Sequence, residues 1–356
     1  MEIRRKVNPN FWNGRRVFIT GHTGFKGSWL TLWLHSMGAI VKGYALEPPT
    51  NPSLFEVANI NDSIYSEIGD IRDLETLKNS IKEFSPDVLI HMAAQPLVRL
   101  SYTEPLITYT TNVIGTVNVL ESARYCTNLK AILSITTDKC YENREWLWGY
   151  RENDPIGGYD PYSSSKGCAE LVTSAYRRSF FKDIGTAYVA SARAGNVIGG
   201  GDWAQDRLVP DILKAIDQNE TIMVRNPKAV RPWQHVLEPL SGYLLLLEDL
   251  YNHGEPFASA WNFGPKDEDC KSVEWILNSI QKEWDGDVKW KTEQDQYLHE
   301  AQLLKLDCSK ANTLLNWHPF WDAKQTVKKI VDWQLAWRAG ADMKTYCLNE
   351  IEQYNK

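Results

Sequence analysis

Residues 15–27 read RRVFITGHTGFKG, a short β-rich run that passes directly into a turn with three glycines. The run predicts a strand over residues 15–20. Residues 27–37 have helical character and stop at Gly38, a residue type that commonly ends helices. A second strand is predicted over residues 39–46. Because glycine lets a turn bend tightly and lets backbone N–H groups approach a ligand, this stretch predicts a β-α-β unit with a binding turn after its first strand.

The same alternation of strands and helices continues along the chain. Further strands are predicted over residues 64–68, 87–92, 130–135, 186–192, 221–224 and 260–263, and helices over residues 74–84, 102–126, 162–181, 208–219, 235–251, 272–283 and 323–337. This pattern indicates an α/β fold whose parallel sheet is covered on both faces. The rhythm breaks at residues 195–206, GNVIGGGDWAQD, which we expect to be a loop. We therefore predict a first domain over residues 1–195, with a segment returning near 230–265, and a smaller domain mainly over residues 196–356.

The composition is that of a globular protein with a sizeable core. The 356 residues are 43% hydrophobic and 24% charged, and the net charge of −6 argues against nucleic acid as a main partner. The six cysteines are scattered without C-x-x-C spacing, so we expect reduced thiols and no metal site. No apolar run reaches the roughly 18 residues of a membrane span, and residues 1–12 lack the apolar segment of a signal peptide. These features predict a cytoplasmic protein without membrane contact.

A second motif, Tyr162-Ser163-Ser164-Ser165-Lys166, begins the predicted helix over residues 162–181. Residues four apart on a helix project from the same face, so the ammonium of Lys166 would lie beside the phenol of Tyr162. A neighbouring cation favours the phenolate and lowers its pKa. Such a phenolate can take a proton from an alcohol while a nicotinamide accepts the hydride. Alone, this spacing also describes an ordinary helix surface, but together with the glycine turn it predicts an oxidoreductase.

Several positions fit a dinucleotide cofactor. The G-x-x-G-x-x-G spacing suits a pyrophosphate at the helix N-terminus and close packing of that helix on the sheet; an ordinary βα turn is the alternative. The acidic residue expected at the end of the second strand is absent, and Glu47 comes slightly late. No arginine stands there to bind a 2′-phosphate, so we expect NAD rather than NADP. His22 is expected to be structural, and His91 a satisfied core histidine. The predicted cofactor-binding residues are Gly21, His22, Thr23, Gly24, Phe25, Lys26, Gly27, Asp70, Ile71, Ala93, Ala94, Gln95, Asn112, Tyr162 and Lys166.

These motifs together resemble the extended short-chain dehydrogenase/reductase family, over about residues 14 to 338. The resemblance also rests on Arg193-x-x-Asn196, Trp261-Asn-Phe-Gly-Pro and Leu306-Asp-Cys-Ser-Lys. It implies a Rossmann-type doubly wound parallel sheet with a smaller C-terminal substrate-binding domain, and a nucleotide sugar bound between the two. It also implies a homodimer in which the helices predicted over residues 102–126 and 162–181 pair across a two-fold axis, with association beyond the dimer left open.

Within this family, Thr136-Thr137-Asp138-Lys139 resembles the sugar-nucleotide 4,6-dehydratases, in which the corresponding stretch is Thr-Asp-Glu. The resemblance implies that Thr137 holds the C4 hydroxyl, that Asp138 is the acid, and that Lys139 stands at the position of the base. This lysine and the stretch over residues 193–203 imply CDP-glucose as the substrate. Lys139 could act as a base only as a neutral amine, which needs burial or neighbouring cations. Two alternatives are electrostatic stabilisation of an enolate by Lys139 and a surface ion pair with Asp138.

The implied reaction is an NAD-dependent dehydration. The C4 carbon is oxidised, water leaves across C5 and C6, and hydride returns to C6, which gives a 4-keto-6-deoxy sugar. The predicted catalytic residues are Thr137, Asp138, Lys139, Tyr162 and Lys166.

The predicted substrate-binding residues are Thr137, Asn196, Arg207 and Arg231. The resemblance implies that Arg231 contacts the diphosphate and Asn196 a phosphate. Arg207 is chosen for its charge and position, with a surface arginine as the alternative. The choice of cytosine rests on the resemblance alone.

Three other functions fit the sequence less fully. One is a nucleotide-sugar 4-epimerase, which needs no acid–base pair beyond the tyrosine and lysine. Another is a dehydratase of dTDP-, UDP- or GDP-hexoses. The last is a non-catalytic NAD-binding scaffold, which has no use for Tyr162, Lys166 and Thr137.

Overall fold

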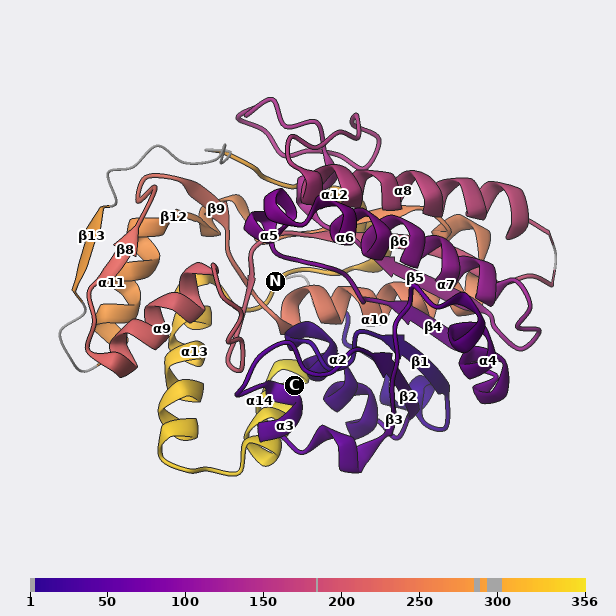
Figure 1. The fold of residues 1–356 in the computed structure, drawn as a ribbon, viewed down its shortest axis with the longest axis horizontal. Helices are drawn as coiled ribbons and strands as arrows, with labels where there is room; N and C mark the ends of the chain where they lie inside the picture. Colours follow the sequence, from indigo (N-terminus) through magenta and orange to yellow (C-terminus); the bar gives the residue numbers. More distant parts are fainter. Residues whose placement is uncertain (1–3, 184, 285–288, 293–302) are drawn as a thin grey trace.

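The protein is described here by a computed structural model covering residues 4–183, 185–284, 289–292 and 303–356. Its centre is a seven-stranded sheet with the order β11-β6-β5-β4-β1-β2-β3, in which every neighbouring pair is parallel (Figure 1). The strands are β1 (Arg16–Thr20), β2 (Ile40–Ala45), β3 (Tyr65–Ile68), β4 (Val88–His91), β5 (Ala131–Ile135), β6 (Tyr188–Ala194) and β11 (Ala260–Phe263). Each lies at a predicted position, so the expected Rossmann-type α/β fold is confirmed.

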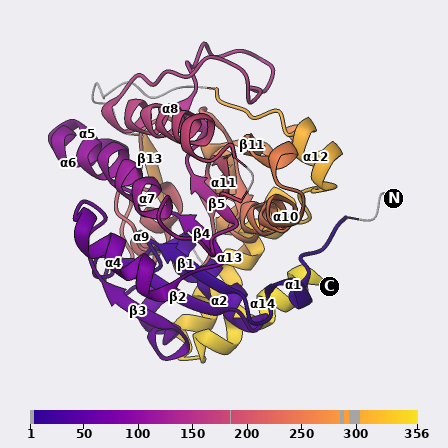
Figure 2. The same ribbon diagram turned by 90° about the vertical axis from the view of Figure 1, so that its right-hand side faces the viewer.

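Helices cover both faces of the sheet because alternate residues of a strand point to opposite sides. In β1, Val17 and Ile19 pack with α2 (Phe25–Ser36) and α10 (Leu237–His253), whereas Phe18 packs with the helices of the other face. Figure 2 shows the two layers. The helices that cover the second face of the sheet are α4 (Leu74–Phe84), α7 (Gly115–Ala123) and α8 (Pro161–Phe180).

The segment predicted to return to the sheet does so. Helix α10 contacts β5 and β6, and β11 pairs with β6 at the edge of the sheet. Part of the predicted loop over residues 195–206 differs from expectation, because it contains β7 (Val197–Ile198), which pairs with β10 (Gln234–His235). This pairing joins segments far apart in the sequence, so no local pattern indicates it.

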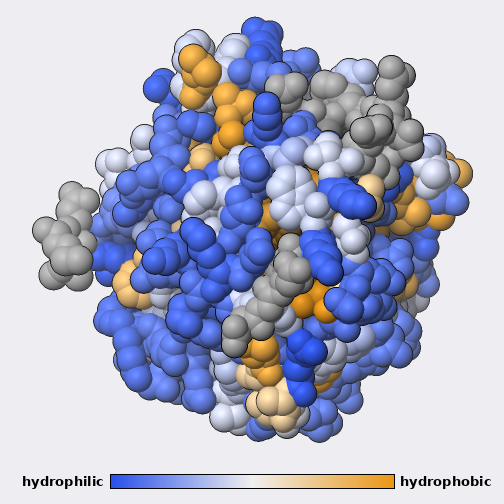
Figure 3. Space-filling view, turned by 90° about the vertical axis from the view of Figure 1, so that its left-hand side faces the viewer, coloured by the Kyte–Doolittle hydropathy of each residue, from blue (hydrophilic) through white to orange (hydrophobic). Residues whose placement is uncertain are grey.

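A second, smaller hydrophobic core lies to the left in Figure 1 and forms what we call the smaller lobe. Figure 3 shows its outer face as mainly hydrophilic, with separate small apolar areas. Its helices are α9 (Leu208–Gln218), α11 (Val273–Glu283) and α13 (Ala323–Arg338), and its short strands are β8 (Ile222–Val224), β9 (Val230–Pro232), β12 (Cys270–Ser272) and β13 (Trp290–Thr292).

The rest of the C-terminal part packs on the large core. Helix α12 (Ser309–Leu315) contacts α10, and α14 (Met343–Asn355) contacts α2. Neither helix was predicted, and their residues Leu315 and Tyr354 are buried in the core of the main sheet.

Two predicted helices have different bounds in the structure. Helix α2 begins at Phe25, earlier than predicted, because the Gly24 carbonyl already accepts a hydrogen bond from the Ser28 N–H. The helix predicted over residues 102–126 is interrupted, since Pro105 starts a new helix and lacks the N–H needed to continue the preceding one. The pieces are α5 (Val98–Thr103), α6 (Pro105–Tyr109), a π-helical turn at Thr110–Ile114, and α7.

Two short helices, α1 (Pro9–Trp12) and α3 (Leu54–Val57), were not predicted. In the part of the chain that the structure describes, none of the helices combines the length and the apolar character that crossing a membrane requires.

Candidate active site

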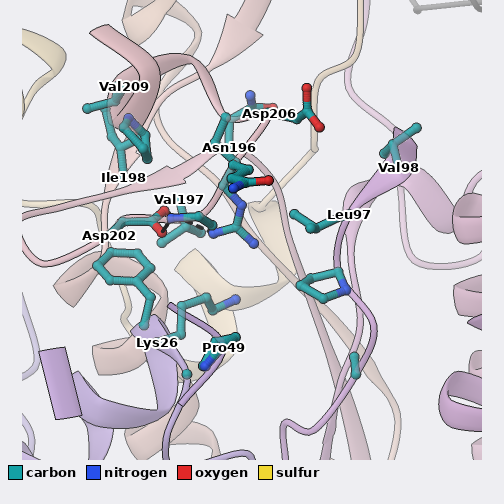
Figure 4. A pocket seen from close by; sticks show the side chains of 18 of the residues that line it. Lys26, Pro49, Leu97, Val98, Asn196, Val197, Ile198, Asp202, Asp206 and Val209 are labelled. Atoms are coloured by element: carbon teal, nitrogen blue, oxygen red, sulfur yellow. Dashed lines mark hydrogen bonds and ion pairs between the residues drawn. The ribbon is translucent and has the colours of Figure 1, made fainter. Parts of the chain in front are cut away.

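A cleft of about 1640 Å³ lies at the carboxyl ends of the strands, between the main sheet and the smaller lobe. In Figure 4, Lys26 and Pro49 lie on one side of it, Asn196 and Asp202 lie above them, and Leu97 and Val98 lie across the opening. Ligands of open parallel sheets bind in such a crevice. The cleft is therefore the candidate active site.

The three turn glycines serve different purposes. A Cβ on Gly21, whose φ is +83°, would lie 2.7 Å from the Ala93 nitrogen, and one on Gly27 would lie 2.1 Å from the Gly21 oxygen. Both positions are closed by the protein's own backbone. A Cβ on Gly24 would meet only the Gly21 oxygen at 3.5 Å, so the space beside the N-terminus of α2 is open. An open N-terminus with backbone N–H groups fits the pyrophosphate of a dinucleotide.

The other residues of the turn do not all face the cleft. Phe25 and Lys26 line it, whereas the His22 ring is buried, shares a 2.7 Å hydrogen bond with Ser66, and leaves no room for a Cβ on Gly43. Burial lowers the pKa of His22 to about 4. The His22 side chain therefore does not line the cleft, and the structural role at the cofactor expected for this residue stays a prediction.

Lys26 stands in a cationic part of the cleft. Its Nζ donates to the Tyr243 hydroxyl at 3.3 Å. Burial, together with the positive charges of Lys166 and Arg207, lowers the pKa of Lys26 to about 7.

The Asp70, Ile71, Ala93 and Ala94 positions line the cleft as predicted. The carboxylate of Asp70 is already bound by Arg72 on both oxygens, and this pairing lowers its pKa. An adenine bound beside Asp70 would therefore contact the Asp70–Arg72 ion pair rather than a free carboxylate. The sequence reasoning did not consider Arg72, although it is only two residues away.

Gln95 and Asn112 are not among the residues that line the cleft. They bind each other instead. The Gln95 N–H donates to Asn112 Oδ1 at 2.8 Å, while Asn112 Nδ2 donates to Ser165 Oγ at 2.8 Å. Their predicted contact with the cofactor stays a prediction. The two residues fasten the loop after β4 to α8, the helix that carries Tyr162 and Lys166.

The expectation for His91 agrees with the structure. The ring is buried, bound to Thr20 Oγ1 at 2.8 Å and Thr116 Oγ1 at 3.0 Å, and burial lowers its pKa to about 3. His91 is a satisfied core histidine.

All five predicted catalytic residues, Thr137, Asp138, Lys139, Tyr162 and Lys166, line the cleft. The first three follow β5 directly. The last two lie on the first turns of α8, which starts where Asp160 accepts a hydrogen bond from the Ser163 N–H at 2.9 Å. The cap fixes the start of the helix and so the direction in which Tyr162 projects.

Asp138 is suited to act as an acid. It is 1% exposed, and burial raises its pKa against the opposing charge of Lys139 and a hydrogen bond from Thr137. The Thr137 hydroxyl donates to Oδ1 at 2.9 Å. Oδ2 has no hydrogen-bond partner among the residues that the structure describes.

Tyr162 and Lys166 differ from the simple expectation. Burial raises the pKa of Tyr162 to about 12, and hydrogen bonding with Thr137 and the charge of Arg207 only partly oppose it. Lys166 Nζ donates to the Ile135 carbonyl at 3.2 Å, and burial lowers the pKa of Lys166 to about 8. In the protein without ligands, burial thus outweighs the neighbouring cations, and Tyr162 is a neutral phenol.

Lys139 is half-buried on the side of the cleft. Its positive charge acts on the neighbouring Asp138, whose pKa it lowers.

Three of the predicted substrate-binding residues, Asn196, Arg207 and Arg231, also line the cleft. Asn196 has φ +44°, a conformation that few residues other than glycine adopt. Arg207 forms an ion pair with buried Asp202 at 2.9 Å, and its positive charge lowers the pKa of Tyr162. Arg231 is buried on β9, and its positive charge lowers the pKa of Asp138.

A buried ion pair supports the end of β5, and sequence reasoning missed it. Arg193 binds Glu170 at 2.9 Å, and Glu170 also accepts hydrogen bonds from Thr136 and Ser191. A signal was present, because Tyr162, Lys166 and Glu170 follow one another at four-residue spacing on one helical face. Among the described residues, no group of histidine, cysteine and acidic side chains could hold a metal ion.

Comparison with known proteins gives the following matches. The family model described as GDP-mannose 4,6 dehydratase matches residues 18–330. The CDP-glucose 4,6-dehydratase of Salmonella typhimurium strain LT2 is 58% identical over 98% of each chain. The probable dTDP-glucose 4,6-dehydratase of Sinorhizobium fredii is 27% identical, over 90% of this chain and 93% of that protein. A Bacillus cereus UDP-glucuronic acid 4-epimerase, solved with UDP-glucuronic acid and NAD, has a TM-score of 0.78 at 20% identity and covers 90% of this chain and 99% of its own.

Proposed function

Since the chain belongs to the GDP-mannose 4,6-dehydratase family, we propose that it is an NAD-dependent hydro-lyase that converts CDP-D-glucose to CDP-4-dehydro-6-deoxy-D-glucose and water. One observation carries the proposal. Thr137, Asp138 and Lys139 line the same cleft as Tyr162 and Lys166, so an acid and a potential base accompany the oxidising pair. An epimerase needs only the oxidising pair.

The choice of CDP-glucose is supported by the Salmonella typhimurium relative, which is named for that substrate and is similar over nearly the whole chain. The choice of NAD is supported by the open space beside Gly24 at the N-terminus of α2. It is also supported by the solved epimerases of the same fold that contain NAD. Bound NAD would accept a hydride and later return it.

The side chains divide the reaction between them. Tyr162, as phenolate, takes the proton of the C4 hydroxyl as hydride leaves C4, while Thr137 hydrogen-bonds the same oxygen. Lys166 and Arg207 supply positive charge that favours the phenolate. Asp138 gives its proton to the departing C6 hydroxyl, and Lys139 takes the C5 proton or stabilises the enolate.

We further propose that the division into two domains corresponds to the two ligands. The sheet and its glycine turn would hold NAD, and the smaller lobe would hold the nucleotide sugar. Arg231 and Arg207 are suited to a diphosphate because a guanidinium binds two oxygens at once, and Asn196 would contact a phosphate.

A product assay tests the function. The protein is incubated with NAD and, separately, with CDP-glucose, dTDP-glucose, UDP-glucose or GDP-mannose, and the alkaline ultraviolet absorbance of a 4-keto product is followed. We expect the product from CDP-glucose and none from the Tyr162→Phe variant. A C4-inverted sugar without a 4-keto product would indicate the epimerase instead, and tight NAD binding without turnover of any sugar would indicate a scaffold.

The proposal includes a homodimer. Helices α6, α7 and α8 contact one another on one side of the molecule and expose apolar side chains, among them Leu106 (73% exposed) and Leu171 (60% exposed). A second copy packed on these helices would cover them. Light scattering should give the dimer mass, and Leu106→Lys with Leu171→Glu should give the monomer. A monomeric wild-type protein would contradict this part of the proposal.

We also propose the cytoplasm as the place of action. All six cysteines are unpaired thiols, as expected in a reducing compartment. Fractionation of cells that express the chain tests this directly.

A further inference from the structure

The proposed reaction leaves two side chains in the wrong protonation state after each turnover. Tyr162 gains the proton of the C4 hydroxyl, and Asp138 loses a proton to the C6 hydroxyl, which leaves as water. The proton removed from C5 is replaced when hydride returns to C6. One proton must therefore move from Tyr162 to Asp138 before the next turnover, and this need rests on the proposed function.

Asp138 cannot easily collect this proton from open water. The side chain is 1% exposed, and the backbone of Gly195 lies so close that a Cβ there would be 1.8 Å from Oδ2. The carboxyl depends on a neighbouring group that can both accept and donate a proton.

The Thr137 hydroxyl is placed to be that group. It donates to Asp138 Oδ1 at 2.9 Å, and it lines the cleft together with Tyr162, whose pKa hydrogen bonding with Thr137 lowers. Thr137 is itself buried, so bulk water does not compete for these bonds. With Thr137 donating to Asp138, its oxygen is left to accept from the Tyr162 phenol, which is the arrangement expected at the end of a turnover.

We propose that the Thr137 hydroxyl regenerates the acid after each turnover by accepting the Tyr162 proton while giving its own proton to Asp138. The O–H bond of Tyr162 breaks as a new one forms on Thr137, and the former Thr137 proton forms the O–H bond of Asp138. The transfer leaves a phenolate and a carboxylic acid, with no change in total charge and no other reactant.

Burial affects the two ends of the relay in the same way. It raises the pKa of Asp138, which favours the transfer, and it raises the pKa of Tyr162 to about 12, which opposes it. The charge of Arg207 lowers the pKa of Tyr162 and so reduces the cost of moving the proton to Asp138.

One other hydroxyl could compete with Thr137. Tyr243 on α10 is fully buried, and its pKa is raised by this burial and by the negative charges of Asp138 and Tyr162. Its hydroxyl, however, accepts a hydrogen bond from Lys26, and among the described residues no hydrogen bond joins it to Asp138, whereas Thr137 donates to Asp138 directly. The hydrogen bonds thus favour Thr137, and a Tyr243→Phe variant tests the competitor.

The test compares the first turnover with steady-state turnover. With CDP-glucose and NAD, 4-keto product is followed under single-turnover and saturating multiple-turnover conditions for wild type, Thr137→Val and Thr137→Ser. Because Thr137 also touches the substrate, Thr137→Val should slow both rates. The relay requires that kcat falls at least about tenfold more than the first-turnover rate, which gives a burst of one product per site. Thr137→Ser keeps the hydroxyl and should remove the burst.

Equal loss of both rates in Thr137→Val would overturn the relay, since Thr137 would then only orient the C4 hydroxyl. A burst in Tyr243→Phe but not in Thr137→Val would overturn it in favour of Tyr243. Wild-type protein that makes no 4-keto product from CDP-glucose would instead overturn the proposed function itself.

Discussion

Burial raises the pKa of two groups at the site, and the two groups need opposite outcomes. For Asp138 a raised pKa keeps the proton that an acid must donate. For Tyr162 it opposes the phenolate that a base must become. The positive charge of Arg207 lowers the pKa of Tyr162 and so favours the phenolate, although burial outweighs it.

Replacing the acid should separate oxidation from elimination. In Asp138→Asn the amide fits the same space but has no proton of comparable acidity, so kcat should fall about a hundredfold to ten-thousandfold. Reduced cofactor should still form in the first turnover, because the C4 step does not use this group. Its ultraviolet absorbance in rapid mixing checks the first step, and the 4-keto assay checks the second. Unchanged kcat would remove Asp138 as the acid.

The role of Lys139 can be decided by isotope exchange. Lys139→Met keeps the length of the side chain but removes the amine. If Lys139 is the base, the variant should lose incorporation of solvent deuterium at C5, which mass spectrometry of the product measures. Normal incorporation with a reduced rate would leave only the electrostatic role. Lys324→Met, at an exposed position outside the cleft, is the matched control.

At the scale of elements, the glycine turn combines two constraints that substitution should separate. Gly24→Ala adds a methyl group into open space, so the protein should stay folded while NAD binding weakens, by about tenfold or more if the pyrophosphate lies there. Gly27→Ala adds a methyl group 2.1 Å from the Gly21 oxygen and should lower the free energy of unfolding by about 1–3 kcal/mol. Fluorescence titration with NAD and urea unfolding measure the two effects. Equal NAD affinity of Gly24→Ala and wild type would place the pyrophosphate elsewhere.

The central strands of the main sheet, such as β4 and β5, could be predicted because each is a short apolar run bounded by turn residues, and buried parallel strands have that pattern. Helix α14 also left a signal that was overlooked. Met343, Cys347, Ile351 and Tyr354 are buried and spaced three or four apart, as on one face of a helix.

Other features had no local signal, because they are made by residues distant in the sequence. The burial of Asp138 depends on the backbone of Gly195, and the side chain of His22 is held by Ser66 on β3. The motif therefore predicted which residues line the cleft, but it could not predict which turn residues face away or how burial raises the pKa of Tyr162.

At the scale of the whole molecule, two buried histidines should make stability depend on pH. Burial lowers the pKa of His22 to about 4 and of His91 to about 3, below their ordinary value of 6.5. Between about pH 4 and 6.5 the unfolded chain therefore binds protons that the folded chain does not, so acidification through this range favours unfolding. Glu248, whose pKa burial raises to about 7, acts in the opposite direction.

A difference measurement isolates the contribution of His91. The free energy of unfolding of wild type minus that of His91→Gln should increase with pH by up to about 1.4 kcal/mol per pH unit between about pH 4 and 6.5. Urea unfolding at a series of pH values measures it. A constant difference for His91→Gln would show that this ring binds protons equally in the folded and the unfolded chain.

The path of the chain between the two cores has a practical consequence. After β6 the chain enters the smaller lobe, comes back for α10 and β11, leaves for α11, comes back for α12, leaves for α13, and ends at α14 against α2. A gene fragment cut at any one point would encode neither half completely. Chimeras that exchange the smaller lobe between relatives will therefore need several junctions, chosen where the chain passes from one core to the other.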